Sequence, residues 1–306
     1  MNKENWTKAN IPDLTGKVII VTGGNSGLGY ESVKAFAENG AEVILASRSA
    51  EKGEAAKKAM GEVKGNISVL KLDLMDFASI KNFTEKFQQK YNRLDVLLNN
   101  AGIMTTPYFL TKDGLEAQMG TNHFGHFLLT GLVFNLIKNT PDSRIVNVSS
   151  MAHKQGKMDF GNLIFENGKG YSPIKSYGRS KLANLLFTYE LQRRMEAGGI
   201  KSIAVAAHPG VSSTNLFQYL ERKMAFKILK PLFSLFFQEQ SMGALPQIRA
   251  SVDENVKGGE FYGPGGFNEL KGYPVLVQSN TASHNLQNAA KLWEISEKIT
   301  GISYSF

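Results

Sequence analysis

The chain has 306 residues, of which 42% are hydrophobic and 20% are charged, with 30 glycines and 9 prolines. This is ordinary globular composition, and the length suits one large α/β domain or two small ones. Cysteine is absent, which excludes disulfides, cysteine-ligated zinc, iron–sulfur clusters and a cysteine nucleophile. The five histidines show no HExxH spacing, so no metal site is expected.

Charge and hydropathy indicate which partners and which cellular location to expect. The net charge is +8, but Lys and Arg are scattered rather than gathered in a block, so no nucleic-acid partner is expected. No apolar run approaches the ~18 residues that a membrane span needs. No secretory signal precedes the first predicted strand. We therefore expect a cytoplasmic protein without a membrane span.

Short β-branched runs alternate with amphipathic segments as far as about residue 207. Strands are predicted at 17–22, 42–46, 67–72, 95–98, 144–148 and 202–206. Helices are predicted at 28–38, 50–60, 77–91, 113–138 and 174–196. Near-continuous apolar strands separated by helices indicate a parallel sheet covered on both faces. With right-handed crossovers this predicts a doubly wound α/β fold in a single domain, 1–306, that binds ligands at the carboxyl ends of its strands.

Residues 216–243 break this alternation and are rich in Phe and Leu, with several basic residues. We predict a helical lid over a substrate site at residues 214–245, with a helix that lies on a membrane surface as the alternative. The aromatic side chains of this segment could equally belong to the core or to a dimer contact. Residues 281–298 are predicted to form a closing amphipathic helix.

A glycine-rich turn, TGGNSGLG, follows the first predicted strand. Gly23 allows the backbone angle of a sharp turn, Gly27 lets the chain approach a pyrophosphate, and Gly29 lets helix and strand pack closely. The helix start then directs free N–H groups and a positive dipole end at the phosphates. Strand, turn and helix together predict a Rossmann-type dinucleotide site formed by Gly23, Asn25, Ser26, Gly27, Leu28 and Gly29.

The end of the second predicted strand reads Ala46-Ser47-Arg48. A site for NAD usually places a carboxylate here for the ribose 2′-hydroxyl. A carboxylate would repel a 2′-phosphate, whereas Ser47 can hydrogen-bond it and Arg48 can pair with it. The sequence therefore predicts NADP as the cofactor; the alternative is that Arg48 is an ordinary exposed loop arginine.

Tyr177 and Lys181 lie four residues apart near the start of a predicted helix, which places them on one face. A free phenol has a pKa of roughly 10, and a nearby ammonium favours the phenolate and can lower that pKa. A tyrosine tuned in this way can give a proton to a carbonyl oxygen or take one from an alcohol. By itself, such a pair also arises by chance on helix faces.

Taken together, the motifs resemble the short-chain dehydrogenase/reductase family. Besides the glycine turn, the ordered matches are Asn99-Asn100-Ala101-Gly102, Asn122, Val148-Ser149-Ser150, Tyr177 with Lys181, and His208-Pro209-Gly210. Each match lies where a strand end or a helix face is predicted. The resemblance covers residues 14–214, with a weaker tail.

The resemblance implies a role for individual residues. Tyr177 would be the catalytic acid/base, and Lys181 would hold the nicotinamide ribose and lower the pKa of the tyrosine. Ser150 would hydrogen-bond the substrate oxygen, since the family's serine is usually the second of such a pair. Asn122 would support a water chain that relays protons to Lys181, although it could also cap or bridge a helix.

The resemblance also implies contacts along the cofactor. Asp73 and Leu74 would flank the adenine. The stretch from Asn99 through Ala101 to Gly102, with Asn100 included, would lie along the cofactor, and Pro209, Gly210, Val211 and Thr214 would contact the nicotinamide carboxamide. Taken singly, Asp73 and Asn99 would be interpreted as turn residues.

One branch of the family fits best. His153 and Gly156 follow the serine pair, Tyr171 precedes Tyr177, and the helix reads SKLANLLFTYEL. This is similar to the retinol-dehydrogenase-like group, which includes WW-domain oxidoreductases and, more distantly, protochlorophyllide reductases. Residues 151–176 form a longer connection than in most of the family and are predicted to cover the active site. Many retinol dehydrogenases carry an N-terminal membrane anchor that is not expected here, which argues against retinoids as the substrates.

The resulting prediction is an NADP(H)-dependent oxidoreductase that moves a hydride between the nicotinamide and a hydrophobic aldehyde, ketone or alcohol. One alternative is a non-enzymatic NADP-binding redox sensor or regulator on the same fold. Another is a reductase of an activated C=C bond. A small-molecule substrate is the expected partner. A homo-oligomer could form through the helices 113–138 and 174–196, which would serve the core of a monomer as well.

Overall fold

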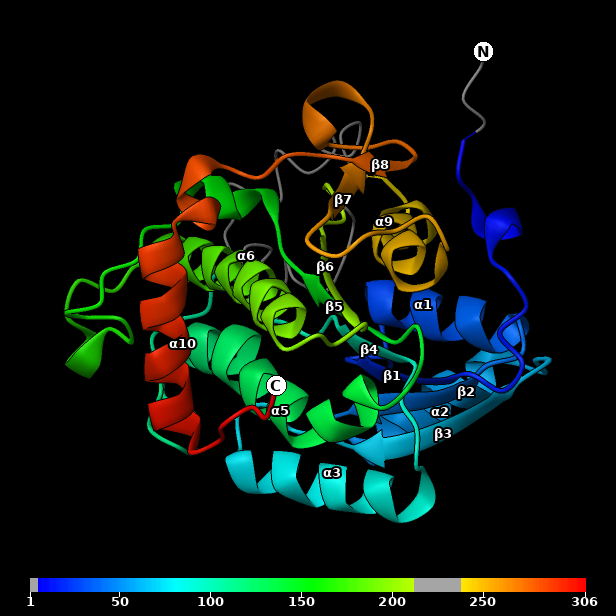
Figure 1. Ribbon diagram of the computed structural model, residues 1–306. Helices are drawn as coiled ribbons and strands as arrows, with labels where there is room; N and C mark the ends of the chain where they lie inside the picture. Colours follow the sequence, from blue (N-terminus) through cyan, green and yellow to red (C-terminus); the bar gives the residue numbers. More distant parts are fainter. Residues whose placement is uncertain (1–4, 212–237) are drawn as a thin grey trace.

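The computed structural model describes residues 5–211 and 238–306, and a twisted eight-stranded sheet lies at its centre (Figure 1). The strands are β1 (Val18–Thr22), β2 (Glu42–Ser47), β3 (Asn66–Lys71), β4 (Val96–Asn99), β5 (Arg144–Val148), β6 (Ile203–Ala207), β7 (Phe261–Pro264) and β8 (Pro274–Leu276). Their order is β3-β2-β1-β4-β5-β6-β7-β8. β1 to β7 run parallel, and β8 pairs antiparallel with β7. The doubly wound sheet is confirmed, and the six predicted strands are correct to within one residue at each end.

The helices that connect the strands cover both faces of the sheet. They are α1 (Gly27–Glu38), α2 (Ala50–Met60), α3 (Phe77–Lys90), α4 (Ala117–Met119), α5 (Gly125–Lys138), α6 (Pro173–Ala197), α9 (Gln240–Val252) and α10 (Leu286–Thr300). A π-helical segment, Gly120–Phe124, joins α4 to α5. Short 3-10 helices lie at Lys8–Asn10, Met151–Gln155, Glu166–Gly168, Phe267–Glu269 and Thr281–His284.

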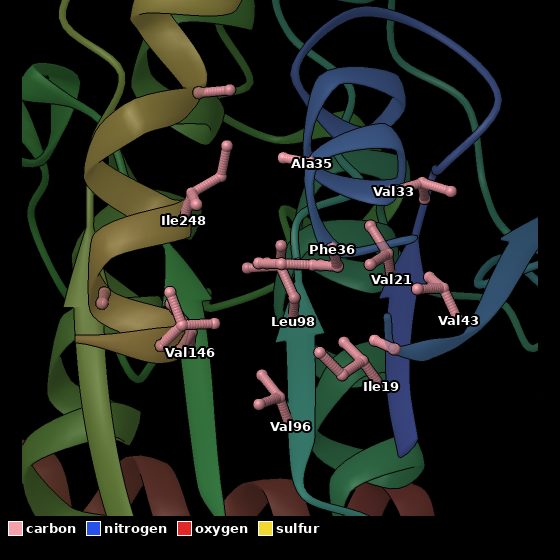
Figure 2. Packing of buried hydrophobic residues seen from close by; sticks show 14 of the residues in the cluster. Ile19, Val21, Val33, Ala35, Phe36, Val43, Val96, Leu98, Val146 and Ile248 are labelled. Carbon is pink, nitrogen blue, oxygen red and sulfur yellow. The ribbon is translucent and has the colours of Figure 1, made fainter. Parts of the chain in front are cut away.

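Alternate residues of the central strands are buried on opposite faces of the sheet, as the period of two in a strand requires. Ile19 and Val21 of β1 pack with Phe36 of α1 and Ile248 of α9 (Figure 2). Their neighbours on the same strand pack instead with side chains of α3 and α5. Because both faces are covered, the carboxyl ends of the strands are the open edge, and the strand order reverses there between β1 and β4.

The long helix predicted over 113–138 begins later than expected, at Ala117. Residues before it form a turn in which Leu110 bridges to Glu116 and the Thr111 N–H donates to the Leu115 carbonyl. The Glu116 carboxylate accepts the N–H groups of Gln118 and Met119, so it caps the helix. A buried cap therefore overrides the helical composition of the four residues that precede Ala117.

The carboxyl-terminal third holds elements that the sequence did not predict, namely α9, β7 and β8. Residues 214–237 of the predicted lid lie outside the described residues. Its other end was assigned wrongly, because residues 240–245 begin α9, and Ala244 and Leu245 are buried against the sheet. β7 and β8 have only 4 and 3 residues, with Gly and Pro among them, which leaves little strand signal.

The closing helix predicted at 281–298 divides into a 3-10 turn and α10, which lies along α6 (Figure 1). Trp293 of α10 packs against Phe127 of α5 and Phe187 of α6. Beyond the helix, the Tyr304 hydroxyl donates to the Phe127 carbonyl. A Cβ at Gly131 would lie 2.9 Å from the Tyr304 ring, so this glycine permits the close approach.

Candidate active site

Two adjoining cavities, of about 390 and 730 Å³, open at the carboxyl ends of the strands. The smaller one reaches Tyr177 and Lys181, and the larger one reaches the ends of β2 and β3. Both are lined by Gly23, Asn25, Ser26, Arg48, Met75, Ala101, Gly102 and Ile103. The shared wall makes them one continuous cleft, long enough for an extended ligand, at the switch point of the sheet.

The glycine turn forms the middle of this cleft. Gly23 and Gly27 adopt left-handed backbone angles, with φ of +68° and +58°. A Cβ at Gly29 would lie 2.3 Å from the Gly23 carbonyl oxygen and 2.7 Å from Nδ2 of Asn100. Ser26 is the N-cap of α1 but makes no side-chain cap hydrogen bond, so the first N–H groups of α1 stay available. This cradle fits the pyrophosphate of a dinucleotide.

Two cations line the larger cavity beyond the end of β2, Arg48 in the connection and Lys52 in the first turn of α2. Lys52 was missed in the sequence, although a lysine in the first turn of the following helix, four residues after Arg48, was a usable signal. Ser47 is buried and lines the cavity. Its hydroxyl donates to the Ser49 carbonyl, so in this structure the hydroxyl is not free to donate to a phosphate, which differs from the prediction. Asp73 and Leu74 line the same cavity, and Oδ1 of Asp73 accepts the Met75 N–H.

Tyr177 and Lys181 lie on the first turns of α6, buried at the inner end of the smaller cavity. The Lys181 ammonium is 5.8 Å from the centre of the Tyr177 ring and donates to the Val148 carbonyl at 2.9 Å. Ser150 hydrogen-bonds the Tyr177 side chain. Its neighbour Ser149 instead donates its hydroxyl to the Lys181 carbonyl, which fixes it to α6. The predicted serine, phenol and amine are therefore brought together at one place.

The pKa of Tyr177 is shifted upward in this structure, not downward as expected. Burial raises the pKa of Tyr177 to about 12, and the hydrogen bond from Ser150 offsets only part of that increase. Burial also lowers the pKa of Lys181 to about 8. Desolvation is the dominant influence on the Tyr177 pKa in the protein alone, and the lowering expected from Lys181 stays a prediction. A phenol that stays protonated at neutral pH is suited to donating a proton.

Asn122 lies in the π-helical segment and fixes the chain after β4. Its Oδ1 accepts the Ile103 N–H, and its Nδ2 donates to the Ile103 carbonyl and to Oγ of Ser180 on α6. A Cβ at Gly102 would lie 3.2 Å from Oδ1 of Asn122 and 3.5 Å from Nζ of Lys181. Asn122 thus bridges the cleft wall and the catalytic helix, and its part in a proton relay stays a prediction.

The two asparagines after β4 are used differently from the prediction. Nδ2 of Asn99 donates to Thr130 and Asn147 inside the protein, and Asn99 lines neither cavity. Asn100 lines the smaller cavity, and its Nδ2 donates to the Thr22 carbonyl. Of the predicted stretch 99–102, Asn100, Ala101 and Gly102 therefore line the cleft and Asn99 does not, because consecutive residues of an extended chain face opposite sides.

The other residues predicted to contact the cofactor lie after β4 and after β6. Ala101, Gly102 and Pro209 line the smaller cavity, and Gly210 and Val211 continue the turn after β6. Thr214 lies outside the described residues.

The connection 151–176 is tied to the catalytic helix rather than free. Arg179 of α6 donates to the carbonyls of Lys157, Asn162 and Leu163. The Tyr171 hydroxyl donates to the carbonyl of Thr106, a residue of the cavity wall. The connection contains two short 3-10 helices, and its last residues already belong to α6.

Two buried histidines beside Asn122 predict acid sensitivity. Burial lowers the pKa of His123 to about 3 and that of His126 to about 4, whereas an unfolded histidine has a pKa near 6.5. Protons therefore bind the unfolded state first, and stability that is complete above about pH 6.5 is lost as the pH falls toward 4. We expect the free energy of unfolding to fall by about 1.4 kcal/mol per pH unit for each histidine between about pH 6 and 4.5.

Urea denaturation over this pH range measures the slope. His123→Phe keeps the apolar packing and should reduce the slope by the contribution of one histidine. His284→Asn, at an exposed position, should leave the slope unchanged. An equal slope in His123→Phe and the wild type would contradict the assignment.

A family model described as short chain dehydrogenase matches residues 17–225. The chain belongs to the short-chain dehydrogenase family. Retinol dehydrogenase 11 of Homo sapiens is 40% identical over 291 residues, which cover 94% of this chain and 87% of the relative. Retinol dehydrogenase 12 of Mus musculus is 38% identical over 302 residues, which cover 97% and 90%.

Solved structures agree with this membership. A crystal structure of an uncharacterised protein from Mycobacterium paratuberculosis has a TM-score of 0.83 and 38% identity, and the match covers 99% of this chain and 100% of that chain. Pseudomonas aeruginosa RhlG, solved with NADP, shares the fold at 20% identity, with a TM-score of 0.64 and coverage of 81% and 94%. The chain is thus an oxidoreductase of the short-chain dehydrogenase family, similar to retinol dehydrogenases. Among the described helices, none is long and apolar enough to cross a bilayer.

Proposed function

We propose that this short-chain dehydrogenase is an NADP(H)-dependent reductase of hydrophobic aldehydes and ketones, or in reverse a dehydrogenase of the corresponding alcohols. The observation that carries the proposal is the buried, protonated Tyr177 beside Ser150 and Lys181 at the inner end of the cleft. NADPH, when bound, supplies the hydride that the carbonyl carbon accepts. Tyr177 then gives its proton to the carbonyl oxygen, so that an alcohol forms.

The neighbouring residues support this proton transfer. The Ser150 hydroxyl, already hydrogen-bonded to Tyr177, is placed to donate to the same carbonyl oxygen as negative charge develops on it. The Lys181 ammonium, held by the Val148 carbonyl, stabilises the phenolate that remains after the proton has left. Tyr177 and Lys181 are buried and Ser150 is partly buried, which strengthens these interactions because little water competes with them.

The apolar wall of the cleft supports a hydrophobic substrate. Ile103, Met104 and Phe109 line the smaller cavity, which Tyr177 also lines. The relatives named retinol dehydrogenases are named for an apolar alcohol, which agrees with such a wall.

A panel of medium-chain aldehydes, aromatic ketones, all-trans-retinal and enones, each with NADPH and NADH, tests the proposal through cofactor absorbance and product analysis. We expect carbonyl reduction with NADPH. Saturation of an enone double bond, with the carbonyl intact, would instead favour C=C reduction. NADPH binding without turnover of any compound would favour a redox sensor.

The cofactor preference has its own test at the end of β2. Arg48→Ala should weaken NADPH binding by about 10- to 100-fold, because a charge-assisted hydrogen bond to a phosphate contributes about 1.5–3 kcal/mol. Lys52→Ala should weaken NADPH binding less, and neither variant should change NADH binding. Fluorescence titration measures both affinities. Lys58→Ala, on the same helix but outside both cavities, is the control; equal losses for NADPH and NADH would contradict the proposal.

A further inference from the structure

The turn after β6 forms one wall of the smaller cavity. Pro209 lines this cavity, and Gly210 takes a left-handed backbone angle, with φ of +63°. A Cβ at Gly210 would lie 2.4 Å from the Leu270 carbonyl oxygen, which also accepts the Val211 N–H at 2.9 Å. The turn therefore lies directly on the backbone of a segment some sixty residues later in the chain, which fixes its position.

His208, at the start of this turn, is buried, and its two ring nitrogens have different partners. Nδ1 accepts the Gly210 N–H at 3.2 Å, so it carries no proton. The ring proton of the neutral histidine is then on Nε2, which lies 2.9 Å from Oε2 of Glu269. The carboxylate and the backbone N–H together select one tautomer.

The ring has little freedom to leave this position. Gly263 of β7 passes so close that a Cβ there would lie 2.1 Å from Nε2 of His208. The Phe261 ring packs against the imidazole at 5.1 Å between centres. The histidine is thus enclosed by β7 on one side, and its proton position depends on Glu269.

Glu269 is itself held in an uncommon conformation. It ends the 3-10 helix Phe267–Glu269 with a φ of +58°, in the left-handed region that non-glycine residues rarely adopt. The hydrogen bond from His208 lowers the pKa of this carboxyl, which keeps it ionised at neutral pH. Its other oxygen lies 3.4 Å from Nζ of Lys154, on the short helix that follows Ser150. The carboxylate therefore connects the turn after β6 to the segment that carries the catalytic serine.

We propose that Glu269 is a positioning residue for hydride transfer, which sets the place of the nicotinamide through the His208 tautomer and the 209–211 turn. The proposal rests on the proposed function. Without the carboxylate, the proton can move to Nδ1, where it would oppose the Gly210 N–H. Two donors facing each other would displace the turn, and with it the wall against which the nicotinamide is expected to lie.

Kinetics and NADPH titration test the positioning role. Glu269→Ala should lower kcat/KM for NADPH by about 10- to 100-fold, as small displacements of reacting groups do, while the KM for the carbonyl substrate changes little. Glu269→Gln should restore most of the loss, because its amide oxygen can accept the Nε2 proton. Lys154→Ala removes the other partner of the carboxylate and should behave as wild type. Equal losses in Glu269→Ala and Lys154→Ala, or no rescue by Glu269→Gln, would overturn the proposal.

The tautomer can be observed without cofactor or activity. In ¹⁵N-histidine-labelled protein, with His208 assigned by comparison with His208→Gln, the wild type should show a protonated Nε2 and an unprotonated Nδ1. Glu269→Gln should retain this pattern, and Glu269→Ala should lose it; thermal melting shows whether each variant folds. A wild-type ring protonated on Nδ1 would overturn the proposal. The absence of any NADPH-dependent turnover in the wild type would refute the proposed function while the tautomer remained measurable.

Discussion

Replacing Tyr177 by phenylalanine is expected to lower kcat by about 10²- to 10⁴-fold, the usual contribution of a general acid or base. Burial raises the pKa of the phenol to about 12, so the phenol keeps its proton at neutral pH and can donate it to the developing alkoxide. Phenylalanine keeps the ring in its buried place, and the affinity for NADPH should therefore stay within a few-fold of the wild-type value. Turnover of the best carbonyl substrate and fluorescence titration of NADPH measure the two effects.

The same helix provides a matched control. Tyr189 is also a tyrosine of α6, but its hydroxyl is hydrogen-bonded to Ser279, and neither residue lines the cleft. Tyr189→Phe should leave kcat unchanged. A Tyr177→Phe enzyme that keeps more than about a tenth of the wild-type kcat would mean that another group supplies the proton.

Replacing Gly29 by alanine should damage the cofactor cradle directly. The new Cβ would lie 2.3 Å from the Gly23 carbonyl oxygen, which is backbone and cannot rotate away. The turn and α1 must then separate, at a cost of about 1–3 kcal/mol, typical of overpacking. We expect NADPH affinity to fall by about 10- to 100-fold and the melting temperature to drop.

Gly161→Ala is the control for this substitution. Gly161 has no left-handed backbone angle, and its nearest neighbour would lie 3.5 Å from the new Cβ, an ordinary contact. Its NADPH affinity and melting temperature should match the wild type. If Gly29→Ala binds NADPH normally, the close approach of Gly29 to Gly23 does not shape the phosphate site.

Much of this fold could be predicted from the sequence because its signals are local. Apolar runs such as residues 144–148 end at turns, and β5 occupies that range without a shift. The failures come from tertiary contacts. The capping of α4 by Glu116 depends on a buried carboxylate that also accepts the Ser176 hydroxyl from another helix. β8 has two exposed apolar residues out of three, a pattern that does not indicate a strand.

The candidate site shows the same division. The order of motifs places Tyr177, Lys181 and Ser150 without coordinates, because each follows a strand end or lies on a helix face. The direction in which the pKa of Tyr177 shifts could not be predicted, because the shift depends on how completely the surrounding chain removes water from the phenol. The choice between Asn99 and Asn100 depends on which way the last residue of β4 faces. Glu269 has no sequence signal, because its partner His208 is distant in the chain.

The packing of the carboxyl-terminal segment has a consequence for association. Trp293 and Tyr304 occupy the outer surface of α5 and α6 with side chains of the same polypeptide. A second molecule that docked on this part of α5 and α6 would first have to displace the carboxyl-terminal segment. The aromatic rings of that segment would then be exposed to water, which is unfavourable. The chain thus carries its own cover over the part of α5 and α6 that Trp293 and Tyr304 contact.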